Sequence, residues 1–288
     1  MTLSSTYTNG FVISKDGTKI GYRQLGNGPG LILVPGGLMA SQNFMELAKE
    51  LSNEFTVYVP DRRGRGLSEN NPKTYGLKEE SEDIQAIMYQ TNTTFIFGLS
   101  SGAIITLQTA IATAAVKKIA IFEPPLTPDG IPFPFVKKYE SAMAAGNYGK
   151  AMLSIINGTT DSLFFKLVPA FLTAPFLNVI IKADAQKDKG NDVSLQKLIY
   201  AFKYDDKIVV DSTSIIDACK NITAEVLLIG GEKSKPFLRN VLDILTPLFK
   251  YATRIELPGV GHTAANNSDN PKLVADALKK FFKDSGTK

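Results

Sequence analysis

The stretch Thr94-Phe-Ile-Phe-Gly-Leu-Ser-Ser-Gly102 contains a short apolar run, then the pattern G-x-S-x-G, and it is followed by a segment rich in alanine and isoleucine. This order predicts a strand, a sharp turn and a helix. Small residues on both sides of Ser100 let the backbone turn tightly, which exposes the hydroxyl at the carboxyl end of the strand. The free N–H groups of the following helix would favour negative charge developing there. A glycine-rich turn with an unreactive serine is the alternative interpretation.

Short apolar runs alternate with helical patterns on both sides of this segment, which indicates a parallel α/β sheet. The runs are short and apolar throughout, as expected for strands that are covered on both faces. The predicted strands are Leu31–Val34, Thr56–Val59, Thr94–Phe97, Ile119–Phe122, Val226–Ile229 and Arg254–Leu257. Ahead of them, Phe11–Ser14 and Lys19–Arg23 flank Asp16-Gly17, which predicts a hairpin.

One interval, residues 126–222, breaks this alternation. It begins in a proline-rich segment and continues with helical stretches that carry many apolar residues. We interpret it as a helical cap inserted into one α/β domain, whose two parts are residues 1–125 and 223–288.

The composition excludes several classes of protein. With 44% hydrophobic and 21% charged residues, the chain is typical of a soluble globular protein. The net charge of +4 is dispersed, so we expect neither a nucleic-acid partner nor a membrane partner. Cys219 is the only cysteine, and the polar first ten residues do not resemble a signal peptide, so we expect a cytoplasmic protein. The composition does not indicate an oligomeric state.

His262 is the only histidine, so any chemistry that requires an imidazole depends on it. It ends the stretch Leu257-Pro-Gly-Val-Gly-His262. Together with Leu31-Ile-Leu-Val-Pro-Gly-Gly37, Asp61-Arg-Arg-Gly-Arg-Gly-Leu-Ser68 and the serine turn, this stretch resembles the α/β-hydrolase superfamily. The resemblance covers residues 11–125 and 223–284 and implies a mostly parallel eight-stranded sheet with an inserted helical cap.

The resemblance implies a role for each matching residue. Ser100 would be the nucleophile and His262 its general base, since a serine hydroxyl is a poor nucleophile without an adjacent base. The backbone N–H groups of Ser101 and Gly37 would form the oxyanion hole, with Leu38 in place of Gly37 if the loop is shifted by one residue. Pro35 departs from the family pattern, which usually has histidine there.

The acidic member of the triad has two candidates. In most of the family it follows the strand that matches Glu225–Ile229, but Ser234 occupies the corresponding position. Glu123, at the end of the preceding strand, is the acid that we favour, and Glu232 is the alternative. The resemblance gives Asp61 and the neighbouring arginines an architectural role rather than a catalytic one.

These features predict a serine hydrolase without a cofactor or metal that cleaves a small apolar carboxylic ester or lactone through an acyl-enzyme. The cap residues Phe164, Phe165 and Phe171, together with Leu38, are candidates for the substrate pocket. Other reactions of the superfamily remain open, including C–C bond hydrolysis, hydroxynitrile lyase chemistry and cofactor-free haloperoxidation, because the fold does not determine the chemistry. The serine at position 234 also leaves open a ligand-binding or receptor-like protein with weak catalysis.

Overall fold

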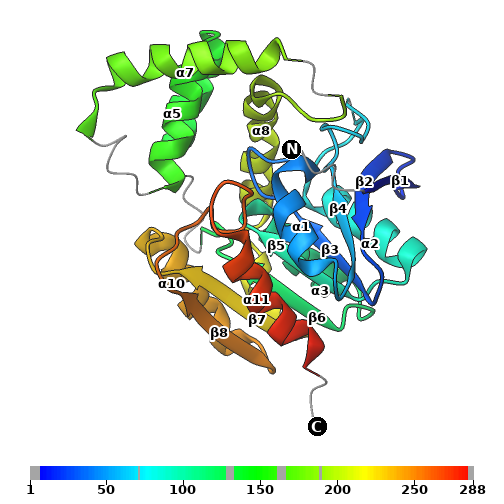
Figure 1. Cartoon of the computed structure of the whole chain (residues 1–288). Coiled ribbons are helices and arrows are strands. Elements are labelled where there is room, and N and C mark those ends of the chain that lie inside the picture. Colours follow the sequence, from blue (N-terminus) through cyan, green and yellow to red (C-terminus); the bar gives the residue numbers. More distant parts are fainter. Residues whose placement is uncertain (1–6, 71, 128–132, 161–166, 188–189, 285–288) are drawn as a thin grey trace.

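An eight-stranded sheet with strand order β1-β2-β4-β3-β5-β6-β7-β8 forms the centre of the molecule (Figure 1). The structure is a computed structural model that describes residues 7–70, 72–127, 133–160, 167–187 and 190–284. The strands are β1 (Thr8–Ile13), β2 (Lys19–Leu25), β3 (Gly30–Val34), β4 (Thr56–Pro60), β5 (Phe95–Leu99), β6 (Lys118–Phe122), β7 (Glu225–Gly231) and β8 (Ala252–Leu257). Strand β2 is antiparallel to both of its neighbours, and the other strands are parallel. The predicted mostly parallel sheet and the hairpin are confirmed.

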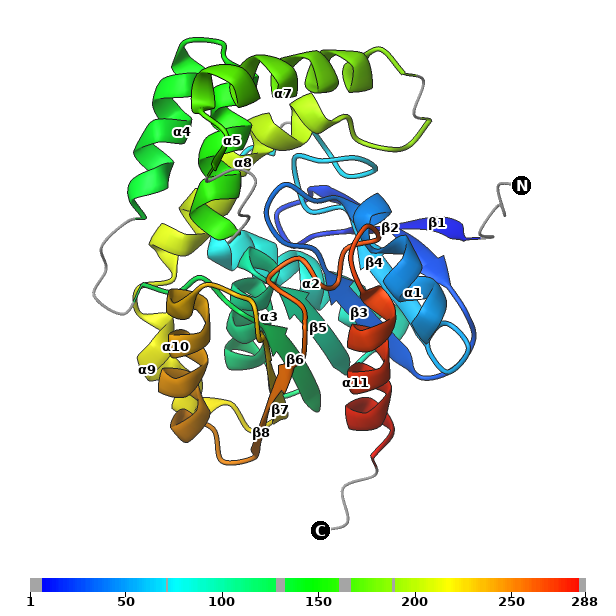
Figure 2. The ribbon, with the colours of Figure 1, turned by 60° about the vertical axis from the view of Figure 1, so that its left-hand side comes forward.

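Helices cover both faces of the sheet because successive residues of a strand point to opposite sides (Figure 2). In β3, Leu31 and Leu33 pack with α1 and α11, whereas Ile32 and Val34 pack with α2 and α3. The helices of these two layers are α1 (Met45–Leu51), α2 (Leu77–Thr91), α3 (Ser101–Ala112), α10 (Pro236–Leu245) and α11 (Pro271–Lys283), and the short 3₁₀ turns are η1 (Ser41–Phe44), η2 (Cys219–Asn221) and η3 (Thr246–Leu248).

Between β6 and β7 the described residues form helices and no strand. These helices are α4 (Pro134–Ala144), α5 (Tyr148–Thr159), α7 (Ala170–Ala185), α8 (Leu195–Asp211) and α9 (Ile215–Ala218). Most of them lie to one side of the sheet in both views (Figures 1 and 2). Helix α8 joins this layer to the rest, because Ile199 packs among the cap helices while Ile208 packs in the core beside the sheet.

Among the described residues, no helix combines the length and the apolar character needed to cross a membrane.

The turn after β4 is built around the buried Asp61. Its Oδ1 accepts the backbone N–H of Ser41 at 2.6 Å, and its Oδ2 accepts that of Leu67 at 2.8 Å. Gly66 has a φ of 53°, and a Cβ on it would overlap the Asp61 carboxylate. These contacts give Asp61 an architectural role in the turn.

Replacing Gly66 with alanine should therefore destabilise the protein in two ways, through the positive φ and through overlap with Asp61. We expect Gly66→Ala to lower the free energy of unfolding by about 3 kcal/mol in urea denaturation. Gly17→Ala is the matched control, because Gly17 has a φ of 87° but a Cβ on it would meet no other atom within 4 Å. That control should lose about 1 kcal/mol. Equal losses in the two variants would contradict the packing role of Asp61.

Candidate active site

Ser100 occupies a strained turn between β5 and α3, with a φ of 57° and a ψ of −125°. Few residues other than glycine adopt a positive φ, and such strain persists only where the surroundings enforce it. Here the Ser100 N–H donates to the carbonyl of Phe122 at 2.9 Å. A Cβ on Gly98 would overlap α3, and a Cβ on Gly102 would overlap the backbone at Val34. The two glycines of the G-x-S-x-G pattern are therefore required by close backbone packing.

Glu123 follows β6, the strand beside β5, and its side chain is fully buried. Its Oε2 lies 2.7 Å from Nδ1 of His262, and its Oε1 accepts the backbone N–H of Gly231 at 2.7 Å. Both carboxylate oxygens thus have partners, as a buried charge requires. Because the carboxylate engages Nδ1, the opposite ring nitrogen, Nε2, is left for a partner in the cavity.

The alternative acid, Glu232, lies elsewhere. Its side chain is exposed, and its Oε2 accepts the N–H of Gly259 at 2.7 Å. Ser234, at the position where most of the family has the acid, is buried, and within the described part of the chain its Oγ has no hydrogen-bond partner. The structure therefore brings Glu123, rather than Glu232, to the imidazole.

Ser100 and His262 line one cavity between the sheet and the cap. The proposed oxyanion residues Gly37 and Ser101 line the same cavity. Its remaining walls are mostly apolar and come from Pro125, Phe133, Phe135, Val136, Thr159, Phe202, Asp205, Asp206, Val209, Phe237 and Leu238. The four residues expected to take part in acyl transfer therefore border a common, largely apolar space.

Of the four residues predicted from the sequence as pocket lining, Leu38 and Phe171 are not among the residues that line this cavity. Phe171 is 73% exposed on α7, and Leu38 packs against the apolar cluster of the cap. Phe164 and Phe165 lie outside the described residues. Helix α7 is apolar on both sides, so its composition does not show which side faces inward. Its buried side is formed by Thr173, Ala174, Leu177 and Ile181.

Aromatic residues other than Phe171 line the cavity. Phe133, Phe135, Phe202 and Phe237 line the cavity. The ring centroids of Phe133 and Phe237 are 5.0 Å apart, so the start of the cap contacts α10, which is distant from it in the sequence. The available sequence signal for Phe133 and Phe135 is their position at the proline-rich start of the cap, where the chain leaves the end of β6.

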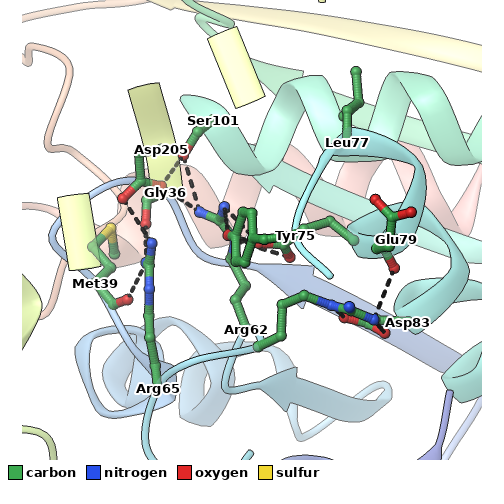
Figure 3. Close-up of polar contacts among 12 residues, drawn as sticks. Gly36, Met39, Arg62, Arg65, Tyr75, Leu77, Glu79, Asp83, Ser101 and Asp205 are labelled. Carbon is green, nitrogen blue, oxygen red and sulfur yellow. Dashed lines mark hydrogen bonds and ion pairs between the residues drawn. The ribbon is translucent and has the colours of Figure 1, made fainter. Parts of the chain in front are cut away.

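Asp205 on α8 is a site residue that sequence reasoning missed. It is only 3% exposed and forms ion pairs with Arg62 and Arg65 (Figure 3). Burial alone would raise the pKa of the Asp205 carboxyl, but the charges of the two arginines outweigh it and hold the pKa below its usual value. A signal was present, since Asp205 interrupts the buried stripe of α8 formed by Leu198, Ile199, Ala201, Phe202 and Ile208.

The adjacent Asp206 also lines the cavity, and its surroundings differ. Burial and the negative charges of Glu140 and Asp205 raise the pKa of the Asp206 carboxyl. Among the described residues that line the cavity, none is a lysine or an arginine. The ionisable side chains of its wall, apart from His262, are therefore carboxylates.

Within the part of the chain that the structure describes, no three His, Cys, Asp or Glu side chains gather so that they could hold a metal ion.

Known proteins resemble this chain in both sequence and structure. An uncharacterized hydrolase, YraK, from Bacillus subtilis is 36% identical over 110 residues, which are 37% of this chain and 40% of that protein. The 2-(acetamidomethylene)succinate hydrolase of Mesorhizobium japonicum is 24% identical over 268 residues, 90% of each chain. An alpha/beta hydrolase from Sphaerobacter thermophilus superposes with a TM-score of 0.74 at 28% identity, covering 95% of this chain and 100% of its own.

Residues 31–277 match the profile of the Alpha/beta hydrolase family, a range that includes the serine turn, Glu123, the cap and His262. With the strand order and the strained serine turn, this match establishes that the chain belongs to the alpha/beta hydrolase family.

Proposed function

We propose that this protein is a serine hydrolase that cleaves a small apolar carboxylic ester or lactone through an acyl-enzyme. The observation that carries the proposal is the 2.7 Å contact between Glu123 Oε2 and His262 Nδ1, at a cavity that Ser100 also lines. A carboxylate on Nδ1 fixes the tautomer in which Nε2 accepts a proton, as a general base for serine must.

In the proposed reaction, His262 removes the proton of the Ser100 hydroxyl as the oxygen attacks the substrate carbonyl. The negative charge moves to the carbonyl oxygen, and the N–H groups of Gly37 and Ser101 stabilise it. His262 then gives its proton to the leaving alcohol. Water, activated by the same imidazole, hydrolyses the acyl-enzyme and restores Ser100. Glu123 stabilises the imidazolium in both halves of the reaction.

The cavity wall supports an apolar, uncharged substrate. Phenylalanine rings dominate it, and aromatic walls favour apolar groups. Asp205 is paired with Arg62 and Arg65, but an ionised Asp206 would repel a substrate carboxylate. No lysine or arginine of the described lining would offset that repulsion. The Mesorhizobium relative is named for the hydrolysis of a succinate derivative, which carries carboxylates. We therefore favour neutral esters and lactones over such acids.

Removal of the nucleophile tests the proposal directly. Ser100→Ala should lower the kcat for p-nitrophenyl acetate by at least about 10⁴-fold, because the acyl-enzyme can no longer form. The wild type, and not this variant, should be labelled by a fluorophosphonate probe, as detected by intact-protein mass spectrometry. Ser234→Ala is the control and should keep both properties. A wild type that neither hydrolyses the ester nor gains an adduct would instead support the ligand-binding alternative.

The choice of acid gives a second, paired test. Glu123→Gln should lower kcat by about 10²-fold to 10⁴-fold, since an amide N–H facing Nδ1 favours the wrong tautomer of His262 and cannot neutralise the imidazolium. Glu232→Gln removes one carboxylate of the same chain length and should change kcat by less than about twofold. Steady-state kinetics of both variants with one ester decides the assignment. The reverse order of effects would show that Glu232 is the acid.

A further inference from the structure

A single carboxylate of the cap reaches three groups of the core. Oδ1 of Asp205 accepts hydrogen bonds from Nη1 of Arg62 at 2.6 Å and from Oγ of Ser101 at 2.8 Å. Its Oδ2 accepts from Nη2 of Arg65 at 2.7 Å. Figure 3 shows Arg62 and Arg65 approaching Asp205 from the turn after β4 while Ser101 approaches from α3. All four side chains are buried, so water does not compete for these bonds.

Arg65, one of the two arginines, also contacts the loop after β3 that contains Gly36 and Gly37, here called the glycine loop. Nη1 of Arg65 donates to the carbonyls of Gly36 at 3.2 Å and Met39 at 2.8 Å. The carbonyl of Gly36 and the N–H of Gly37 belong to one planar peptide unit, so the orientation of one sets the orientation of the other. Asp205 thus acts through Arg65 on the first proposed oxyanion donor.

The serine on the other side supplies the second donor. Oγ of Ser101 is held by Asp205 and also accepts from Nη1 of Arg62 at 3.0 Å. Ser101 follows the nucleophile directly, and its own N–H is the proposed donor. Two hydrogen bonds on its side chain restrict the rotation of this residue within the strained turn.

Helix α8 also packs directly on the glycine loop. A Cβ placed on Gly37 would lie 3.2 Å from the ring of Phe202 and 3.4 Å from Cγ of Asp205. The first distance is tighter than ordinary contact, so the absence of a side chain on Gly37 allows the cap helix to lie this close. The loop is therefore held both by α8 and by Arg65.

A contribution to stability does not by itself explain why these charged side chains are buried. Taking an arginine and an aspartate out of water is unfavourable for each ion, and apolar residues of similar volume often stabilise a fold equally well. Ion pairs with fixed hydrogen-bond geometry provide orientation, which apolar contacts do not. Here the ion pairs orient the peptide groups of Gly37 and Ser101. These carry the two proposed oxyanion donors, and the rate of the reaction depends strongly on accurate placement of such donors.

We propose that Asp205 is a positioning residue through which the cap helix α8 sets the geometry of both oxyanion donors, Gly37 and Ser101. The inference rests on the proposed function, since it gives these two N–H groups their role. It makes docking of the cap a condition for full transition-state stabilisation, and not only a means of enclosing the substrate.

Asp205→Asn tests this positioning role against Asp83→Asn as a matched control. Asp83 is also buried and forms a 2.6 Å ion pair with the neighbouring Arg63, but its partner is not the arginine bonded to Gly36 or Ser101. Both variants should lose thermal stability. Only Asp205→Asn should lower kcat for p-nitrophenyl acetate, by about tenfold to a hundredfold, with KM changed less than about twofold.

The second readout is the affinity for an alkyl boronic acid, which forms a tetrahedral adduct with the serine and so mimics the transition state. In Asp205→Asn this affinity should fall by about the same factor as kcat, and in Asp83→Asn it should not change. A general loss of structure would lower the active fraction without this selective loss. Equal kcat and equal boronic acid affinity in the two variants would overturn the inference.

If Asp205→Asn does not fold, Ser101→Ala provides the test of the positioning role. This variant keeps its backbone N–H and loses only the side-chain anchor, so kcat should fall by about threefold or more at constant KM. An unchanged kcat would overturn the positioning role. A wild type that lacks esterase activity and forms no fluorophosphonate adduct would be a different failure, because it would remove the proposed function itself and the inference with it.

Discussion

The strained backbone at Ser100 is the constraint on which the rest of the site depends. A non-glycine residue with a positive φ keeps that conformation only where its neighbours leave no alternative. Gly98 and Gly102 supply this condition, because they let β5, α3 and the end of β3 approach until no side chain fits between them. The turn then lies at the edge of the sheet where the loops after β3, β6 and β8 also begin, so the other candidate site residues lie around it.

Glu123 contacts His262 from the end of β6, the strand beside β7, after which the resemblance places the acid in most of the family. Strands β6 and β7 are parallel neighbours, so a carboxylate at the end of either one emerges at the same edge of the sheet. Glu123 spans the gap by accepting the N–H of Gly231 from β7 with one oxygen and contacting His262 with the other. The serine at position 234 therefore does not leave the imidazole without a carboxylate.

Helix α8 connects the cap to the candidate active site. One end of the helix packs among the cap helices and the other among the core helices, with Asp205 between these two regions. Because Asp205 pairs with arginines from the turn after β4, that turn is also linked to the cap. In this fold the cap is inserted far along the chain from the glycine loop, yet the two are joined by buried, directional contacts.

The sequence by itself determined the alternation of strands and helices, the hairpin, the need for glycines around the serine turn and the identity of the only available imidazole, because each follows from local periodicity, local backbone geometry or composition. Only the tertiary structure showed which of Glu123 and Glu232 contacts His262, since Glu123 lies 139 residues away from it in the chain. It also showed that Asp205 has partners, and that Phe133, Phe135, Phe202 and Phe237, rather than Phe171, line the cavity. Periodicity indicates which face of an element is buried, whereas the groups that this face meets depend on contacts between segments distant in sequence, and those contacts form only when the whole chain packs.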